Sequence, residues 1–492
     1  MLLLGIDIGT SSIKVSLVAV DSRETIASAQ YPAYESPINS PKPGWAEQPP
    51  EMWWNHVQQA ILSMHGSGKY NPSDITAIGI AYQMHGLVAV NQNQEVLFPS
   101  IIWCDSRAVE IGNQAFHDIG EEKCLTHLLN SPGNFTAAKL AWVKKNEPAL
   151  FEQIDKIMLP GDFISMKLTG QVTTSISALS EGIFWDFQSN SISQDVMQYF
   201  GFSENIIPPV HEVFSEHGRV REDVAQSLRL KAGIPVTYKA GDQPNNALSL
   251  NVLEAGEVAA TAGTSGVIYG VSDQLTFDNE SRVNTFAHVN HASGKNSLGV
   301  LLCINGTGIL NKWARNLFYP DISYPDMNRQ AASVTVGSDG LQVLPFGNGA
   351  ERMLGNKLIG AHLLNIDFNI HTQAHIFRAV QEGIAFAFRY GLDIMRENGM
   401  NPTVIRAGKA NLFLSDLFLD AFVNATHVPV ELYTSDGSVG AAIGAGIGSG
   451  IYQSSKEAFS NSRPMRLVEP VENSPYEVHY QDWLAMLKKH MA

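Results

Sequence analysis

The chain has 492 residues, of which 44% are hydrophobic and 16% charged, and its formal net charge at pH 7 is −15. This length exceeds what one hydrophobic core usually serves, so two or three globular domains are expected. The acidic balance argues against a general nucleic-acid or anionic-membrane surface, which needs clustered Lys and Arg. Three scattered cysteines without C-x-x-C spacing indicate neither a zinc site nor a disulfide framework, and they favour a reducing compartment.

The first apolar run ends in a small-residue turn, Gly9-Thr10-Ser11, which returns in mid-chain as Gly263-Thr264-Ser265. In both places a second apolar run follows, which predicts strand, turn, strand. Such turns let backbone N–H groups approach phosphate oxygens, and their hydroxyls add donors. The repeat therefore indicates two related halves that grip one nucleotide from both sides. An ordinary hairpin turn without a ligand remains the alternative.

Asp7 lies inside the first predicted strand, among apolar residues. A carboxylate buried there is costly unless a cation or a hydrogen-bond donor accompanies it. We therefore expect Mg²⁺ near Asp7, held through water.

Strand-like and helical segments alternate along the chain, as α/β folds require. Strands are predicted at residues 75–80, 96–101, 236–240, 298–304 and 404–406, and helices at 50–64, 138–145, 372–398 and 439–448. Polar residues directly follow several of these strands, where site residues of open sheets usually lie. We expect a domain boundary near residues 245–255.

The small-residue helix at 439–448 is far shorter than the about 20 residues that span a bilayer. Its Gly440-x-x-x-Gly444 spacing predicts a helix that packs closely inside a soluble core. No secretory signal pattern is visible at the start of the sequence, so a cytoplasmic location is expected.

Nine motifs, in order along nearly the whole chain, resemble the FGGY family of carbohydrate kinases. They are Gly5-Ile-Asp-Ile-Gly-Thr-Ser-Ser-Ile-Lys14, Gly44-Trp-Ala-Glu-Gln48, Gln83-Met-His-Gly86, Trp103-Cys-Asp-Ser-Arg107, Leu159-Pro-Gly-Asp162, Gly241-Asp242, Ala262-Gly-Thr-Ser265, Leu344-Pro345 through Glu351-Arg352, and Gly437-Ser-Val-Gly-Ala-Ala442. The resemblance implies an α/β, two-domain, actin-like or ribonuclease-H-like ATPase fold with a cleft between the domains. It also implies a sugar-binding domain at residues 1–248 and a nucleotide-binding domain at 249–492.

Within this family, the Gln83–Gly86 stretch and the segment Thr136-Ala-Ala-Lys-Leu-Ala-Trp142 are most similar to the xylulokinase group. The resemblance implies ATP-dependent transfer of the γ-phosphoryl group to the terminal hydroxyl of a ketopentose, D-xylulose, giving D-xylulose 5-phosphate. Kinases of ribulose, gluconate or glycerol remain alternatives, as does a catalytically weak sugar-binding regulatory homologue. An actin-like or chaperone ATPase would need the same phosphate turns but no sugar site.

Phosphoryl transfer to an alcohol needs a base that accepts the hydroxyl proton. We expect Asp242 to be this base, because it follows a predicted buried strand directly and a carboxylate suits a loose transition state. A helix cap near Pro244 is the structural alternative for Asp242.

The resemblance places the sugar against Met84, His85, Trp103 and Asp105, with Gln243 next to the base. Paired donors and acceptors beside an aromatic or thioether surface suit a sugar. Taken singly, His85 is equally readable as a structural histidine, and Met84 and Trp103 as core residues.

The resemblance assigns ATP to Thr10, Ser11 and Lys14 in the first turn, to Gly263, Thr264 and Ser265 in the second, and to Gly408 near the adenosine. Asp7 is assigned to Mg²⁺ through water. Lys14 could also be a solvated residue at the end of a strand. The expected partners are thus a small sugar and ATP, without nucleic acid or membrane, and a homodimer is left open.

Two stretches depart from the family pattern. Gln243 stands where Asn usually follows the base, and Pro244 fixes φ and removes an N–H. Ala407-Gly408-Lys409 replaces three consecutive glycines near the adenosine. These changes put sugar recognition and nucleotide affinity in question.

Overall fold

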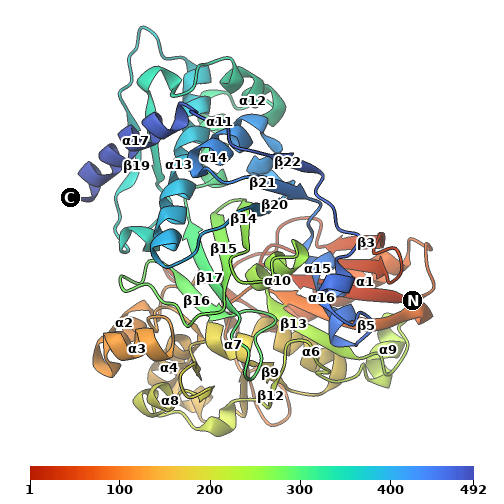
Figure 1. The fold of residues 1–492 in the computed structure, drawn as a ribbon. Helices are drawn as coiled ribbons and strands as arrows, with labels where there is room; N and C mark the ends of the chain where they lie inside the picture. Colours follow the sequence, from red (N-terminus) through yellow and green to blue (C-terminus); the bar gives the residue numbers. More distant parts are fainter.

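The computed structural model describes residues 1–492, which form two α/β lobes (Figure 1). The first lobe contains a five-stranded sheet of order β13-β5-β1-β2-β3, and the second a seven-stranded sheet of order β16-β17-β15-β14-β20-β21-β22. The first sheet consists of β1 (Leu2–Ile8), β2 (Ile13–Ala19), β3 (Thr25–Tyr31), β5 (Ile75–Tyr82) and β13 (Val236–Gly241). The second consists of β14 (Val258–Ala262), β15 (Gly266–Ser272), β16 (Asn284–Ala287), β17 (Leu298–Ile304), β20 (Ile405–Gly408), β21 (Val430–Tyr433) and β22 (Arg466–Val468).

The two sheets share one pairing pattern. In the first lobe β1 pairs antiparallel with β2 and parallel with β5, while in the second β14 pairs antiparallel with β15 and parallel with β20. The strand order β3-β2-β1-β5-β13 thus corresponds to β17-β15-β14-β20-β21. This repeat confirms the prediction of two related halves, and both small-residue turns join the two antiparallel strands at the centre of their sheets.

Each half contributes one helix that packs against the sheet of the other half. Helix α10 (Asp242–Ser249) follows β13, but Ala247 packs with apolar residues of β14 and β15 from the second lobe. Helix α15 (Gly437–Gly448) follows β21, but it packs on β1, β5 and β13 of the first lobe, as Figure 1 shows. The two lobes are therefore joined by a pair of exchanged helices, and α10 and α15 also contact each other.

Small residues make these helix contacts close. A Cβ built on Gly5 or on Gly79 would overlap the backbone of α15. On the helix itself, a Cβ on Gly440 would lie 2.8 Å from the Cβ of Ser249, and one on Gly444 would lie 2.7 Å from the Tyr238 ring. The predicted close-packing role of Gly440 and Gly444 is confirmed.

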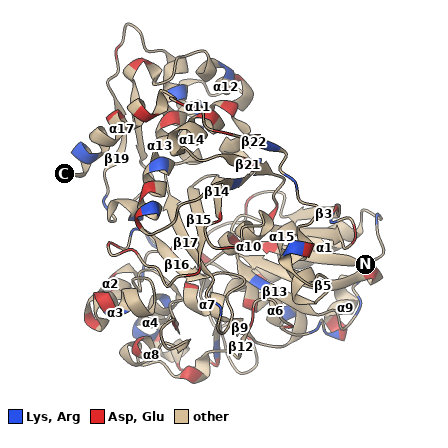
Figure 2. Cartoon of the chain, viewed as in Figure 1, with Lys and Arg blue, Asp and Glu red and all other residues tan.

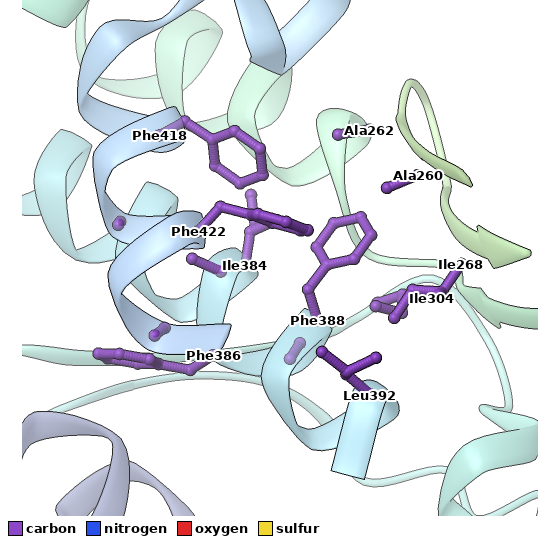
Figure 3. Close-up of a cluster of buried hydrophobic side chains, with 14 of the residues drawn as sticks. Ala260, Ala262, Ile268, Ile304, Ile384, Phe386, Phe388, Leu392, Phe418 and Phe422 are labelled. Atoms are coloured by element: carbon purple, nitrogen blue, oxygen red, sulfur yellow. The ribbon is translucent and has the colours of Figure 1, made fainter. Parts of the chain in front are cut away.

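Aromatic side chains support the second small-residue turn from behind. Helices α13 (Gln373–Glu397) and α14 (Asp416–Thr426) bring Phe388 and Phe422 together, with ring centroids 5.2 Å apart. Figure 3 shows Phe388 between Phe422 and the isoleucines of the sheet. The Phe388 ring reaches to within 2.6 Å of where a Cβ on Gly266 would be, so the turn rests on a close-packed core.

A second contact between the lobes lies at the edge of the second sheet. Strand β16 is the edge strand there, and helix α7 (Ile176–Glu181) of the first lobe packs beside it. The Ser177 hydroxyl donates to the Ala287 carbonyl at 2.9 Å, and the Ala287 N–H donates to the Ser180 hydroxyl at 2.9 Å. Side chains of the first lobe thereby satisfy backbone groups that an edge strand leaves unpaired.

Most predicted elements are present. Helices form at α1 (Pro50–His65), α4 (Thr136–Asn146), α13 and α15, and strands at β5, β13, β17 and β20. The strand predicted at 96–101 is wrong: only Ser100–Ile101 (β7) form a strand there, and Val96 makes an isolated bridge. Pro99 interrupts the segment because it has no N–H to donate to a neighbouring strand.

The remaining elements surround the two sheets. The helices are α2 (Val109–Ile119), α3 (Glu121–His127), α5 (Pro148–Phe151), α6 (Pro160–Thr169), α8 (Gln194–Phe200), α9 (Glu222–Leu228), α11 (Gly308–Phe318), α12 (Tyr324–Ala332), α16 (Ser455–Ala458) and α17 (Tyr476–Met491). The short strands are β4 (Glu47–Gln48), β6 (Val88–Val90), β8 (Lys156–Met158), β9 (Thr174–Ser175), β10 (Trp185–Asp186), β11 (Ser191–Ile192), β12 (Val210–His211), β18 (Gln342–Phe346) and β19 (Gly360–Leu364). No helix has both the length and the apolar character that crossing a membrane requires. Figure 2 shows acidic and basic segments interspersed over both lobes.

Candidate active site

Two carboxylates, Asp242 and Asp7, lie close together where the lobes meet. Helix α10 begins at Asp242, directly after β13, and Asp7 is near the end of β1. Burial, and then the negative charge of Asp7, raise the pKa of Asp242 to about 7. Burial and the charge of Asp436 raise the pKa of Asp7 to about 6, against the opposing effect of Lys14. A carboxylate that titrates near neutral pH suits a catalytic base.

Because Asp242 is the first residue of α10, Gly241 occupies the capping position and the alternative of an Asp242 cap is wrong. Gln243 follows Asp242 directly at the start of α10 and opposes the rise in the pKa of Asp242. Its predicted contact with the sugar stays a prediction.

Helix α15 of the second lobe covers Asp7. Asp436 caps this helix by accepting from the Ser438 N–H at 2.9 Å, and it forms an ion pair with Lys14. The Lys14 side chain is half-exposed, but its ammonium group is paired with Asp436. Lys14 is therefore not simply a solvated residue at the end of a strand. Its predicted contact with ATP stays a prediction.

The first turn is braced by a hydrogen-bond network that includes Trp103. The Trp103 indole N–H donates to the Thr10 hydroxyl at 3.0 Å, and that hydroxyl lies 3.1 Å from the Gln83 side-chain oxygen. The Gln48 amide donates to the Thr10 carbonyl at 2.9 Å. Trp103 is 51% exposed, so its ring remains available on the surface beside the turn. Ser11 is exposed at the tip.

The second turn borders a cavity of about 530 Å³. The N–H groups of Gly308 and Ile309, at the start of α11, donate to the carbonyls of Gly263 and Thr264 at 2.9 and 3.1 Å. A cavity of this size suits a ligand of nucleotide dimensions. Its lining residues are Glu35, Ala262, Gly263, Thr264, Gly308, Ile309, Asn311, Lys312, Tyr324, Asn328, Asn411, Leu412, Leu414 and Ser415.

The first turn lies close to this cavity without lining it. Glu35 comes from the first lobe, and the N–H of its neighbour Ser36 donates to the Ser11 carbonyl at 2.7 Å. The first turn therefore lies next to the rim of the cavity that the second turn lines. Gly408 and Ser265 do not line the cavity, and a Cβ on Gly408 would meet Ser435 at 3.0 Å.

His85 is half-buried and held in one tautomer. Its Nδ1 lies 3.1 Å from the Glu181 carbonyl oxygen, which can only accept, so Nδ1 carries the proton. Burial is the main cause that lowers the pKa of His85 to about 3, so the ring is neutral and its Nε2 is an acceptor. His85 has φ of 60°, which few residues other than glycine adopt. This backbone position sets the direction of the ring.

Met84 contacts the backbone next to the base. Its Cγ lies 2.6 Å from the position of a Cβ on Gly241, so only glycine fits there. Asp105, in contrast, is fully buried and bonded within the protein: its carboxylate accepts from the Arg107 guanidinium at 2.6 to 3.0 Å and from the Ala46 N–H at 2.6 Å. Its predicted contact with the sugar stays a prediction.

Four residues of the candidate site were not predicted from the sequence. Lys139 donates to the His85 carbonyl at 2.7 Å, and Glu181 lies beside Gly241. Lys312 and Asn411 line the cavity. The Asn305-Gly-Thr-Gly308 stretch before α11 could have indicated the cavity wall, and Lys139 lies in the family-like segment Thr136–Trp142, whereas Glu181 carries no motif.

Comparison with known proteins gives a consistent answer over almost the whole chain. The N-terminal domain of the FGGY family of carbohydrate kinases matches residues 2–249, and the C-terminal domain of that family matches residues 258–449. A xylulose kinase of Escherichia coli is 27% identical over 443 residues, covering 89% of this chain and 88% of the relative. A xylulose kinase of Bacillus subtilis is 28% identical over 462 residues, covering 92% and 89%.

Comparison with solved structures identifies the same kind of protein. The crystal structure of a "xyloylose kinase" from Brucella ovis superimposes with a TM-score of 0.89 at 25% identity and covers 99% of both chains. The two lobes, the paired turns and both matched domains lead to one conclusion. This chain belongs to the FGGY family of carbohydrate kinases.

Proposed function

We propose that this kinase transfers the γ-phosphoryl group of ATP to the terminal hydroxyl of D-xylulose, producing D-xylulose 5-phosphate. The observation that carries the proposal is the half-buried Asp242 carboxylate, which lies beside Asp7 at the contact between the lobes. The substrate follows from the relatives, which are xylulose kinases.

Asp242 acts as the base. It accepts the proton of the sugar hydroxyl as the oxygen attacks the γ-phosphorus, and ADP leaves on the opposite side. Its place as the first residue of α10 fixes the backbone position of this carboxylate. Because the transition state is loose, this positioning contributes more than basicity does.

The sugar binds against Met84 and His85. The unprotonated Nε2 of His85 accepts a hydrogen bond from one sugar hydroxyl, and Met84 provides an apolar surface. Trp103 forms the side of the sugar site that lies next to the first turn. Sugar recognition is thereby assigned to the first lobe, residues 1–248.

ATP binds in the cavity of the second lobe, residues 249–492. Gly263, Thr264 and Lys312 meet its phosphates there, while Thr10 and Ser11 approach from the first lobe. Gly408 and Asn411 lie toward the adenosine end. Small residues in both turns expose backbone N–H groups to the phosphate oxygens.

Mg²⁺ fits this site. Asp7 and Asp242 place two carboxylates of raised pKa together, which is a local excess of negative charge that a cation would relieve. No group of three or more His, Cys, Asp or Glu side chains is arranged to hold a metal ion. That donor set suits a metal carried mainly by phosphate and water, with Asp7 positioning the water. When bound, Mg²⁺ neutralises charge on the phosphates.

The deciding experiment is a coupled ADP-release assay with a panel of ketoses, aldoses, polyols and sugar acids. We expect saturable turnover with D-xylulose at a kcat/KM at least tenfold above that with ribulose, gluconate or glycerol. A kcat/KM that is higher with another sugar than with D-xylulose would overturn the substrate assignment. Sugar-dependent thermal stabilisation without turnover would identify a sugar-binding regulator instead. The cytoplasmic location and a homodimer stay predictions.

A further inference from the structure

Glu181 is a buried acid that neither the family motifs nor the transfer step accounts for. It ends helix α7, the helix that holds the edge strand of the second lobe, and its side chain is 2% exposed. Its Oε1 is buried without any hydrogen-bond partner. An unpartnered buried polar atom is destabilising, so a residue in this state calls for a partner that is present when the enzyme works.

The Glu181 carboxyl lies next to the residues assigned to the sugar and the base. Its Oε2 is 3.0 Å from the position of a Cβ on Gly241, the residue before Asp242. Met84 reaches the same point, with its Cγ at 2.6 Å. The Glu181 carbonyl oxygen also accepts from His85. Glu181 thus lies next to Gly241 and Met84 and holds His85 in place. Because Gly241 has no side chain, there is room for the Glu181 carboxyl.

Burial raises the pKa of Glu181 well above its ordinary value, and the negative charges of Asp242 and Asp162 raise it further, so the protonated form is favoured. Tyr82 and Lys139 act in the opposite direction. A neutral carboxyl beside a catalytic carboxylate can both donate and accept a hydrogen bond without adding negative charge.

We propose that Glu181 is a specificity-determining residue, whose carboxyl group hydrogen-bonds to an oxygen of the acceptor sugar beside Asp242. The inference rests on the proposed sugar kinase function. It assigns to Glu181 the recognition of one hydroxyl or carbonyl group, so that a sugar lacking that group leaves a buried carboxyl unpaired and is rejected. Binding of ATP does not involve Glu181.

The test compares the wild-type enzyme with Glu181→Gln and Glu181→Met. Gln keeps the shape and can donate and accept, whereas Met keeps the approximate volume and can do neither. We expect Glu181→Gln to retain the sugar KM within about threefold, and Glu181→Met to raise it at least tenfold, with the ATP KM unchanged in both. Glu212→Met, at an exposed glutamate, is the matched control and should change neither constant.

Wild-type turnover on the sugar panel tests the proposed function independently of these variants. If wild-type turnover is present but the sugar KM of a folded Glu181→Met is unchanged, the inference is overturned and a purely structural role remains. A tenfold rise in sugar KM after Glu181→Gln would contradict the neutral carboxyl as the recognition group. A matching loss of ATP affinity would also contradict it.

If Glu181→Met does not fold, monodeoxy analogues of the sugar decide. Wild type and the smaller variant Glu181→Ala, which cannot hydrogen-bond, are assayed with each analogue, and kcat/KM values form an enzyme–substrate cycle. We expect one analogue to lose at least tenfold with wild type but less than threefold with Glu181→Ala, because the hydrogen bond is already absent from that variant. The absence of coupling with every analogue would overturn the proposal.

Discussion

Gly437, the first residue of α15, packs so closely against Asp7 of β1 that a Cβ at this position would overlap the Asp7 carboxylate. A residue of the second half of the sequence therefore sets the position of an acid in the first strand. The N-terminus of a helix also favours a nearby carboxylate. The relation makes α15 part of the candidate active site as well as of the hinge between the lobes.

Gly437→Ala should displace the Asp7 carboxylate. Overpacking of this kind typically costs about 1–3 kcal/mol, and a displaced metal-positioning acid should lower kcat at least 30-fold. Steady-state assays and thermal melting measure the two effects. Ser449→Ala, at the other end of the same helix, is the control and should keep activity within twofold. If the kcat of Gly437→Ala equals that of the wild type, the close contact between Gly437 and Asp7 does not matter for phosphoryl transfer.

Lys312→Met should weaken ATP binding. Lys312 is exposed at the wall of the cavity that also contains Gly263 and Thr264, so its charge is available to the phosphates. We expect the KM for ATP to rise about tenfold, or about 1.4 kcal/mol, with the sugar KM unchanged. The effect should shrink at high salt because the lysine is exposed. Lys489→Met, in α17, is the control and should leave the KM for ATP unchanged. An unchanged KM for ATP in Lys312→Met would mean that the phosphates bind elsewhere.

The activity should fall on the acid side of neutrality. Asp242 must be deprotonated to accept a proton, and its pKa is raised to about 7 by burial and by Asp7. The value of kcat/KM for the sugar, measured at saturating ATP over a series of Mg²⁺ concentrations, should therefore decline about tenfold per pH unit below the pKa of Asp242. Bound Mg²⁺ lowers this pKa below about 7, so the acid side of the profile should move to lower pH as the Mg²⁺ concentration rises. A profile flat from pH 8 to pH 5 would argue against a titrating base.

Much of the fold could be predicted because it rests on local patterns. The paired turns at Gly9 and Gly263 lie between apolar runs, and they mark the central hairpin of each sheet as expected. The Gly440-x-x-x-Gly444 spacing predicted a closely packed helix, and the structure has one. Short strands are harder, as residues 96–101 show, because a two-residue strand depends on its neighbours more than on its own sequence.

The candidate site was less accessible, because contacts between distant segments define it. No spacing rule reveals that α15 covers Asp7, or that Asp105 is engaged by Arg107. Glu181 sits in a segment without a motif, and only its burial beside Gly241 makes it conspicuous. The division of roles at residues 248 and 249 stays a prediction, since each half contributes a helix to the other lobe.

The variant that tests the central claim should fold. The pKa of Asp242 is raised in the folded state, so its contribution to stability is complete below its unfolded pKa of about 4 and is lost as pH rises through about 7. At pH 8 the ionised, half-buried Asp242 therefore destabilises the protein without ligands. Asp242→Asn removes that charge, and its melting temperature at pH 8 should be equal to or above that of the wild type.

The most direct measurement is single-turnover phosphoryl transfer from ATP to D-xylulose by Asp242→Asn, with sugar affinity measured by calorimetry on the same preparation. The amide has nearly the shape of the carboxylate but cannot accept the proton. We expect the transfer rate to fall about 10³-fold or more, with the sugar Kd within about threefold of the wild type. Transfer within tenfold of the wild-type rate would contradict Asp242 as the base.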